Sequence, residues 1–262
     1  MFNKIPNIRT AVLISGYLRT FEKTYGSFLA NILNPLQADV FVHTWETLGS
    51  PASKQNSDAG MDQVATMTKI DAITKIINPV AMNIETHQMY NIKSQIIEKI
   101  AILNEQDRGG LPHRNLVSYG SMLYSWNQVR RMVEKYERNN GFEYDMMIRL
   151  RTDCNFTKKI NILNYNKDNL YVPQIGKYFD DGMNDQFAVG NGKNIKTYMN
   201  MYEHLLFYVN NRVCVLRPES LLRYHMKANG IQLIEDAIEF NIIRPDNNVV
   251  TQTVLGQRWS KP

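Results

Sequence analysis

The first 45 residues contain two apolar segments separated by a segment of helical periodicity, and this order strongly limits the possible folds. Residues 9–16 read RTAVLISG and residues 38–45 read ADVFVHTW, and both are apolar runs of strand length. Residues 17–33 between them carry apolar side chains at helical spacing, and we expect Pro35 to end that helix. A strand, a helix and a second strand in this order predict a parallel pairing and an α/β fold.

The rest of the chain continues this pattern. Further strands are expected at residues 81–87, 144–156, 169–175 and 186–190, with a last pair of strands within 232–245. Helices are expected at residues 61–77, 90–106, 118–141, 195–211 and 218–231, with loops at 46–60, 107–115 and 176–186. No repeat, low-complexity segment or linker interrupts the chain. We therefore expect one domain, residues 1–262, built on a mixed, mainly parallel sheet flanked by helices.

Composition excludes some classes of protein. The 30 basic and 25 acidic side chains give a net charge of +5, but they are interspersed and form no basic block, so nucleic acid is not an expected partner. The two cysteines, Cys154 and Cys214, are far apart and fit neither a zinc site nor a disulfide framework, which indicates a reducing compartment. The N-terminal apolar run is too short for a signal peptide or a membrane span. We expect a cytoplasmic protein that visits the membrane at most peripherally.

Polar residues follow the apolar runs where the expected strands end. In residues 144–156, YDMMIRLRTDCNF, an apolar strand leads directly into Arg151, Asp153 and Asn155. Ligands of open α/β sheets bind at the carboxyl ends of the strands, so such residues are candidates for a site. Arginine matches phosphate groups, while aspartate and asparagine oxygens suit Mg²⁺ or Mn²⁺. The strand-end candidates are Ser15, Gly16, Arg19, His43, Trp45, Arg149, Arg151, Asp153, Asn155, Asp185 and Gln186.

The order of these motifs resembles that of GT-A-fold glycosyltransferases, in particular the bacterial and viral enzymes of surface-polysaccharide biosynthesis. The shared elements are the segments ISGYLRTF, DVFVHTW, SMLYSWNQVRRMVEKYE, YDMMIRLRTDCNF and NDQFAVGN, which lie between Arg9 and Ile234. The resemblance implies a GT-A-like (Rossmann-like) fold. It also implies transfer of a sugar, as by a hexosyltransferase, from a nucleotide-sugar donor to a hydroxyl of a glycan or glycolipid acceptor.

The resemblance also implies roles for individual residues. The family's Asp-x-Asp metal motif falls on Asp153 and Asn155, where an amide replaces the second carboxylate and weakens the expected Mn²⁺ or Mg²⁺ site. Asp185 matches the position near the sugar and acceptor, where a carboxylate acts as general base. The remaining candidates are assigned to donor binding; they are Ser15, Gly16, Arg19, His43, Trp45, Tyr124, Arg149, Arg151 and Gln186.

Simpler interpretations of these residues stay open at this point. Asp153 is also a common turn residue, and Arg149 and Arg151 also fit structural ion pairs. Asp185 also fits a solvated turn. At the level of the whole protein, the alternatives are a non-catalytic nucleotide-sugar-binding module with a degenerate metal motif, and a metal-dependent phosphoryl-transfer enzyme. The absence of a Walker or GxGxxG glycine motif argues against kinases and dehydrogenases.

Overall fold

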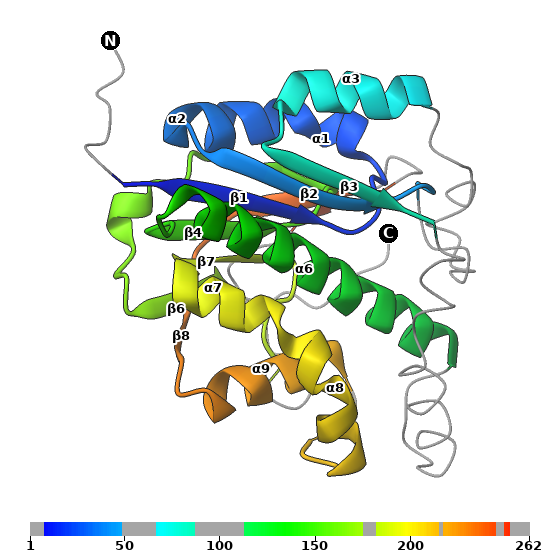
Figure 1. The fold of residues 1–262 in the computed structure, drawn as a ribbon, viewed down its shortest axis with the longest axis vertical. Coiled ribbons are helices and arrows are strands. Elements are labelled where there is room, and N and C mark those ends of the chain that lie inside the picture. Colours follow the sequence, from blue (N-terminus) through cyan, green and yellow to red (C-terminus); the bar gives the residue numbers. More distant parts are fainter. Residues whose placement is uncertain are drawn as a thin grey trace.

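The computed structural model of this chain describes residues 8–48, 67–86, 113–174, 182–214, 217–244 and 249–251. Seven strands form one mixed sheet between two layers of helices (Figure 1). In spatial order the strands are β3 (Ala81–Glu85), β2 (Asp39–Trp45), β1 (Thr10–Ser15), β4 (Met146–Leu150), β7 (Phe187–Asn191), β6 (Asn169–Pro173) and β8 (Gln232–Asp236).

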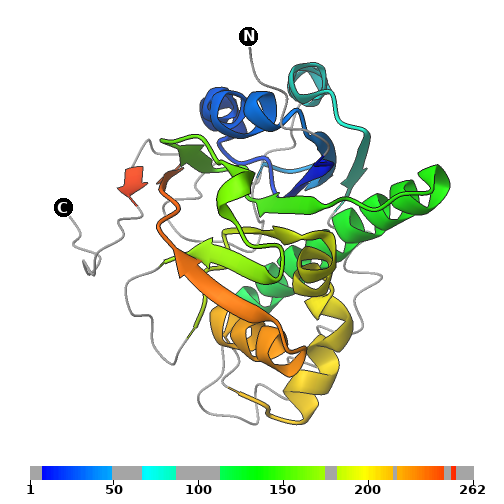
Figure 2. The same cartoon turned by 90° about the vertical axis from the view of Figure 1, so that its left-hand side faces the viewer.

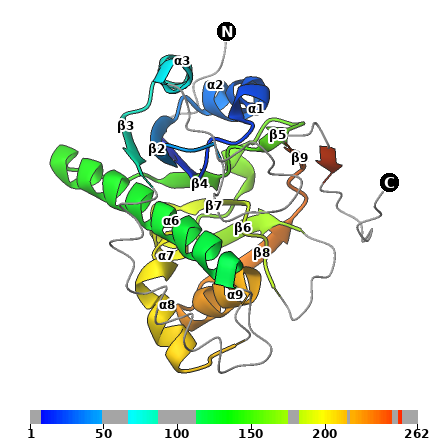
Figure 3. The same cartoon turned by 90° about the vertical axis from the view of Figure 1, so that its right-hand side faces the viewer.

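The helices divide between the two faces of this sheet (Figures 1 and 3). On one face lie α1 (Phe21–Phe28), a π-helical segment (Leu29–Leu33), α2 (Asn34–Leu36) and α3 (Met67–Ile77). On the other lie α6 (His113–Asn140), α7 (Gly192–Met199), α8 (Met201–Asn210) and α9 (Pro218–Ala228). A short 3₁₀ helix, Ile162–Asn164, precedes β6. No helix among the described residues is long and apolar enough to cross a membrane.

Most strand pairings in the large sheet are parallel. Strand β1 pairs in parallel with β2 and β4, β2 with β3, and β6 with β8, while β7 runs antiparallel between β4 and β6. The predicted α/β class, with a mixed, mainly parallel sheet flanked by helices, is therefore confirmed.

Alternating residues of the central strands feed two separate cores, because successive side chains of a strand point to opposite faces. Leu13 and Met147 pack with α6 and α7, whereas Val12 and Ile148 pack with α1 and α3. Both faces of these strands are thus buried, as expected for parallel strands that are apolar throughout.

The first helix differs from its prediction, because Pro35 does not end it. The π-helical segment carries the chain past Phe28, and Pro35 lies within the three-residue α2 that continues it. The helix ends two residues later at Gln37, whose φ of 47° is left-handed. Helix α1 also begins at Phe21, later than the apolar spacing suggested.

Three other boundaries differ from the sequence-based expectation. The helix predicted at residues 195–211 breaks at Asn200 into α7 and α8. Helix α6 begins at His113, inside the predicted loop at 107–115. The strands β8 and β9 (Phe240–Ile243) do not pair with each other: β8 joins the large sheet, and β9 pairs with β5 (Cys154–Phe156) and β10 (Val249–Thr251) in a small second sheet. The predicted helix at 90–106 lies outside the described residues.

The small sheet lies on the α1 side of the molecule, and β5 contacts α1 (Figures 2 and 3). Because β5 follows β4 by only three residues, the turn 151–153 leads the chain out of the large sheet and into the small one. Two buried aromatic side chains, Phe156 on β5 and Phe240 on β9, pack against each other with ring centroids 5.6 Å apart.

The start of α7 gives a test of this packing. A Cβ at Gly192 would lie 2.7 Å from the backbone oxygen of Tyr144, so Gly192→Ala should lower the unfolding free energy by about 1–3 kcal/mol. Gly26 in α1 is the matched control, because its Cβ would meet nothing within 4 Å and alanine favours helix there. Urea unfolding of both variants measures the difference. Equal stabilities would show that the approach at Gly192 is not as close as described.

Candidate functional site

The structure brings the sequence-predicted strand ends together at one edge of the large sheet. The strands β1, β2, β3 and β4 are parallel and adjacent, so the residues that follow them share that edge. Leu150 pairs with Phe187, so the antiparallel β7 begins where β4 ends. This register places Asp185 and Gln186 beside the turn that contains Arg151 and Asp153.

Asp153 lies at the centre of an arginine cluster. Its carboxylate is 1% exposed and accepts hydrogen bonds from Arg151 Nε at 3.0 Å on Oδ1 and from Arg151 Nη2 at 2.6 Å on Oδ2. Arg19 Nη1 lies 3.4 Å from Oδ2. Burial alone would raise the pKa of Asp153, but Arg151 and Arg19, with a contribution from Arg244, hold that pKa below its usual range. Asp153 is therefore ionised and paired at neutral pH.

Hydrogen bonds from distant segments hold the turn 151–153 in place. Thr152 Oγ1 donates to the backbone oxygen of Tyr17 at 2.5 Å, and Thr24 Oγ1 donates to the backbone oxygen of Thr152 at 2.5 Å. The backbone N–H of Ile243 donates to the backbone oxygen of Asp153 at 3.0 Å. The turn is thus fixed to the β1–α1 loop, to α1 and to β9.

Asp153 and Asn155, which were expected to bind a divalent ion, do not present free oxygens towards a common point. Both oxygens of Asp153 face guanidinium nitrogens, and Asn155 lies on β5, paired with Asn241 in the small sheet. Within the described ranges, no group of three or more histidine, cysteine, aspartate or glutamate side chains is arranged to hold a metal ion. The expected Mn²⁺ or Mg²⁺ stays a prediction.

A second cluster joins the ends of β1 and β2 to α6. Ser125 Oγ accepts a hydrogen bond from the backbone N–H of Gly16 at 2.8 Å and lies 2.8 Å from His43 Nδ1. The Ser125 hydroxyl has one proton to donate, and His43 Nδ1 is closer to Oγ than the backbone oxygen of His43, which lies at 3.4 Å. The hydroxyl therefore donates to Nδ1, and the imidazole proton is on Nε2. That nitrogen lies 3.5 Å from Glu85 Oε1 at the end of β3. Gly16, with a φ of 109°, adopts a conformation suited to glycine.

Trp45 and Tyr124 are buried in this second cluster. Their rings stack with centroids 5.9 Å apart, Tyr17 packs beside Trp45, and Trp45 is fully buried. Tyr124 Oη donates to Glu85 Oε2 at 2.9 Å, and burial together with this hydrogen bond raises the pKa of Tyr124. The two rings are thus buried against each other, and the assignment of Trp45 and Tyr124 to donor binding stays a prediction.

Arg149 is also fully buried. Its guanidinium lies 4.2 Å above the ring of Trp126, and Nη1 donates a hydrogen bond to the backbone oxygen of Asp185. Burial lowers the pKa of Arg149, while the nearby Tyr198 and Asp185 act in the opposite direction. Arg149 thus fixes the segment that carries Asp185, a positioning role that differs from the expected contact with donor.

Asp185 itself is half-buried, and its carboxylate has no hydrogen bond or ion pair with any described residue. Its charge acts on Arg149, Arg151 and Glu219. The pKa of Glu219 is raised mainly by burial and also by the negative charge of Asp185. Beside it, Gln186 donates its backbone N–H to Asn184 Oδ1 at 2.7 Å. Several buried polar atoms in this neighbourhood have no hydrogen-bond partner among the described residues: Arg149 Nε and Nη2, Asn184 Nδ2, Gln186 Oε1 and Tyr198 Oη.

Sequence reasoning did not identify Ser125, Glu85 or Arg244 as neighbours of the site. Glu85 ends β3 and lies two residues before the end of the strand expected at residues 81–87, so the strand-end rule pointed to its neighbourhood without selecting it. Ser125 lies mid-helix, and no signal in the sequence distinguishes it from other helical serines. Of the predicted residues, Ser15 is buried at the end of β1, and its hydroxyl has no hydrogen-bond partner among the described residues.

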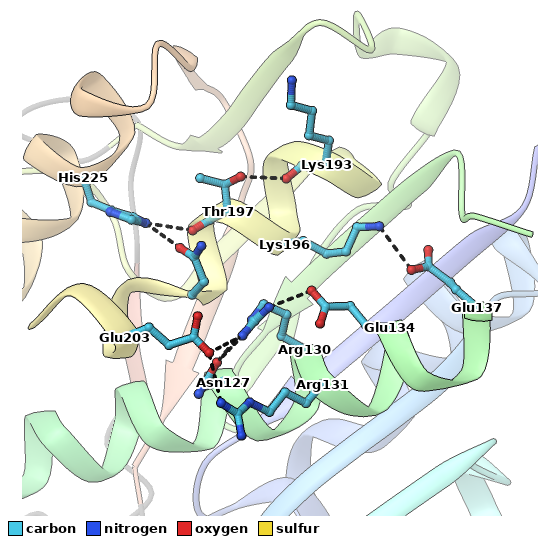
Figure 4. Close-up of polar contacts among 11 residues, drawn as sticks. Asn127, Arg130, Arg131, Glu134, Glu137, Lys193, Lys196, Thr197, Glu203 and His225 are labelled. Carbon is cyan, nitrogen blue, oxygen red and sulfur yellow. Dashed lines mark hydrogen bonds and ion pairs between the residues drawn. The ribbon is translucent and has the colours of Figure 1, made fainter. Parts of the chain in front are cut away.

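A groove of about 790 Å³ lies at the opposite edge, between the end of α6 and α7 (Figure 4). Its cations are largely paired with its own carboxylates: Arg130 Nη1 lies 2.7 Å from Glu134 Oε1, and Lys196 Nζ lies 3.1 Å from Glu137 Oε2. The first pair lies within α6, and the second joins α7 to α6. The strand-end edge, with its buried and incompletely paired polar groups, is the stronger candidate for a functional site.

His225 is a structural residue near this groove. Its Nε2 faces the backbone oxygen of Thr197 at 2.9 Å and Asn200 Oδ1 at 2.8 Å, so Nε2 carries the proton (Figure 4). Nδ1 accepts from Tyr208 Oη at 2.7 Å. The neutral imidazole therefore links α7, α8 and α9, and the contact with Asn200 lies at the break between α7 and α8.

We expect His225 to make folding stability depend on pH. Burial lowers the pKa of His225 to about 4 from an ordinary value of 6.5, so the unfolded chain binds the proton more tightly than the folded one. The contribution of the neutral His225 to the free energy of unfolding is fully present above pH 6.5. It is lost as the pH falls towards 4, and the loss is roughly 3 kcal/mol. Urea unfolding from pH 7 to pH 4 should show a flatter profile for His225→Gln than for the parent. Parallel profiles would contradict the assignment.

Loss of the carboxylate at Asp153 should destabilise the fold. Asp153→Asn leaves Arg151 and Arg19 beside a neutral amide, and breaking a buried ion pair from one side costs on the order of 3 kcal/mol. Asp168→Asn, at an exposed position before β6, is the matched control and should cost little. Chemical denaturation of the two variants provides the comparison. A small and equal effect for both would mean that Asp153 is less buried and less paired than described.

Comparison with known proteins assigns this chain to a family. A search of curated proteins gives no match. Among solved structures, the crystal structure of mouse xyloside xylosyltransferase 1 in its apo form is similar with a TM-score of 0.44 and 9% identity, over 87% of this chain and 84% of that chain. A likeness this distant supports no conclusion about activity. Residues 5–248 match the family described as Domain of unknown function (DUF7796), and the chain belongs to that family.

Proposed function

We propose that this protein is a glycosyltransferase that moves a sugar from a nucleotide-diphosphate donor to a hydroxyl of a glycan or glycolipid acceptor. The observation that carries the proposal is the arrangement at the strand-end edge. Arg19 and Arg151 contact the ionised Asp153, and Asp185 lies beside them with a carboxylate that no described residue pairs. The sequence resemblance to GT-A enzymes supports the same proposal, because its motifs supply these residues.

In this proposal the arginines bind the diphosphate and stabilise the charge that develops on it as it departs. The acceptor oxygen forms a bond to the anomeric carbon of the sugar, while the bond between that carbon and the diphosphate breaks and its electron pair goes to the diphosphate. The acceptor proton passes to Asp185. The hydrogen bond from Arg149 to the backbone of Asp185 sets the position of this base.

The finer assignments are part of the proposal. They comprise a hexose as the transferred sugar, an acceptor in surface-polysaccharide biosynthesis, and a cytoplasmic enzyme that approaches membranes only peripherally. No observation favours a phosphoryl-transfer enzyme, because two-ion catalysis needs a carboxylate cluster and the described part of the chain contains no such group.

Replacing Asp185 separates an enzyme from a binding module. Asp185→Asn keeps the size of the side chain but removes its basicity, so transfer should fall by about 10²–10⁴-fold while nucleotide affinity barely changes. The measurements are transfer and donor hydrolysis with a panel of UDP- and GDP-sugars, together with calorimetric titration of the nucleotide. Asp168→Asn is the control for the chemical change itself.

The other outcomes have defined meanings. An equal loss of transfer and nucleotide affinity would place Asp185 on the donor. If transfer is measurable and the variant retains it, the carboxylate belongs to a solvated turn. A parent protein that binds nucleotide sugars but neither hydrolyses nor transfers them would be the non-catalytic binding module.

A further inference from the structure

We propose that the arginines around Asp153 hold the donor diphosphate without a divalent ion. The inference rests on the proposed function, because it states how that function's donor is bound. It follows from a conflict between the sequence motif and the geometry. The motif Asp153-Cys154-Asn155 occupies the place of a metal site, but its one carboxylate is already paired with guanidinium groups.

The pairing leaves little room for a cation. A hard divalent ion needs carboxylate or carbonyl oxygens pointing at it, with several ligands in a regular geometry. Oδ1 of Asp153 accepts from Arg151 at 3.0 Å, and Oδ2 accepts from Arg151 at 2.6 Å with Arg19 at 3.4 Å. An ion that used either oxygen would lie next to the positive charge of Arg151, and at Oδ2 also next to that of Arg19.

The charges around Asp153 do not balance. Arg151 and Arg19 contact its carboxylate, and Arg244 also lowers its pKa. Among the groups in direct contact, two guanidinium groups face the single carboxylate of Asp153, which is a surplus of one positive charge. A diphosphate offers a matching negative charge, and arginine forks bind phosphate oxygens in pairs.

The exposure of these side chains points in the same direction. The Asp153 side chain is 1% exposed, whereas those of Arg151 and Arg19 are 18% and 26% exposed. Arg19 Nε and Nη2 and Arg151 Nη1 form no hydrogen bond to any described residue. An approaching ligand therefore meets arginine donors first, while the carboxylate beneath orients them.

The arginines are also held in place before any ligand arrives. The backbone N–H of Arg19 donates to the backbone oxygen of Leu48 at 2.8 Å, and its φ of 43° fixes the loop in a left-handed turn. Arg151 belongs to the turn that Thr24 and Ile243 hold by hydrogen bonds. Donors that are ordered in advance lose less conformational entropy on binding, so their contacts contribute more affinity.

Binding measurements without turnover test the proposal. The probes are inorganic pyrophosphate, UDP and GDP, titrated calorimetrically into the whole protein in EDTA and again in Mn²⁺. We expect at least one probe to bind in EDTA, with a Kd that Mn²⁺ changes by less than about threefold. Binding that requires Mn²⁺ would overturn the inference and leave the glycosyltransferase proposal standing. If no probe binds in either buffer, both proposals fail.

Variants of Arg19 locate the binding site. Arg19→Gln removes the charge and should weaken the probe in EDTA by about tenfold or more, whereas Arg19→Lys should keep part of the affinity. Arg138→Gln is the matched control, because Arg138 is an exposed arginine near the end of α6 at the opposite edge of the sheet. Thermal melting of each variant checks that it is folded. Equal affinities for Arg19→Gln and Arg138→Gln would overturn the assignment of the diphosphate to this cluster.

Discussion

Burial of both faces of β1 and β4 is the constraint on which the rest of the molecule depends. Their side chains alternate between two cores, so a charged residue within these strands needs polar or aromatic partners inside the protein, and other charged residues come after the strands end. Arg149 has such partners inside the protein: its guanidinium lies over the ring of Trp126 and donates a hydrogen bond to the backbone oxygen of Asp185. Arg151 and Asp153 instead come after β4 has ended at Leu150. The concentration of polar groups at one edge is thus a direct result of how completely the strands are covered.

Pairing inside the protein also changes what the strand-end motif means. A carboxylate after a parallel strand suggests a cation site when only the sequence is considered. In the folded chain Asp153 instead organises Arg19 and Arg151, and three backbone or hydroxyl hydrogen bonds hold its turn. In the proposed binding mode the same residues form an anion-binding surface built on a buried carboxylate, in place of the cation site expected from the sequence.

The sequence predicted the fold class and the position of the edge because both follow from local patterns. Apolar runs such as residues 10–15 and 39–45 identify strands regardless of their neighbours, and their order implies parallel pairing. The break at Asn200 could not be predicted, because it coincides with a contact to His225 from another helix. Nor could the separation of β8 from β9, because β9 pairs with β5. The burial of Trp45 and Arg149 likewise depends on α6, whose position the sequence does not state.

The hydrogen bond from Thr20 Oγ1 to the backbone oxygen of Ile243 joins two segments that are 223 residues apart. Contacts of such long range form late, because a long loop must close before they contribute stability. During synthesis the ribosome releases Thr20 and Asp153 well before Ile243 emerges. The turn that carries Asp153 therefore stays without its β9 partner until Ile243 has emerged. Assembly of this edge is complete only after the residues of β9 have joined it.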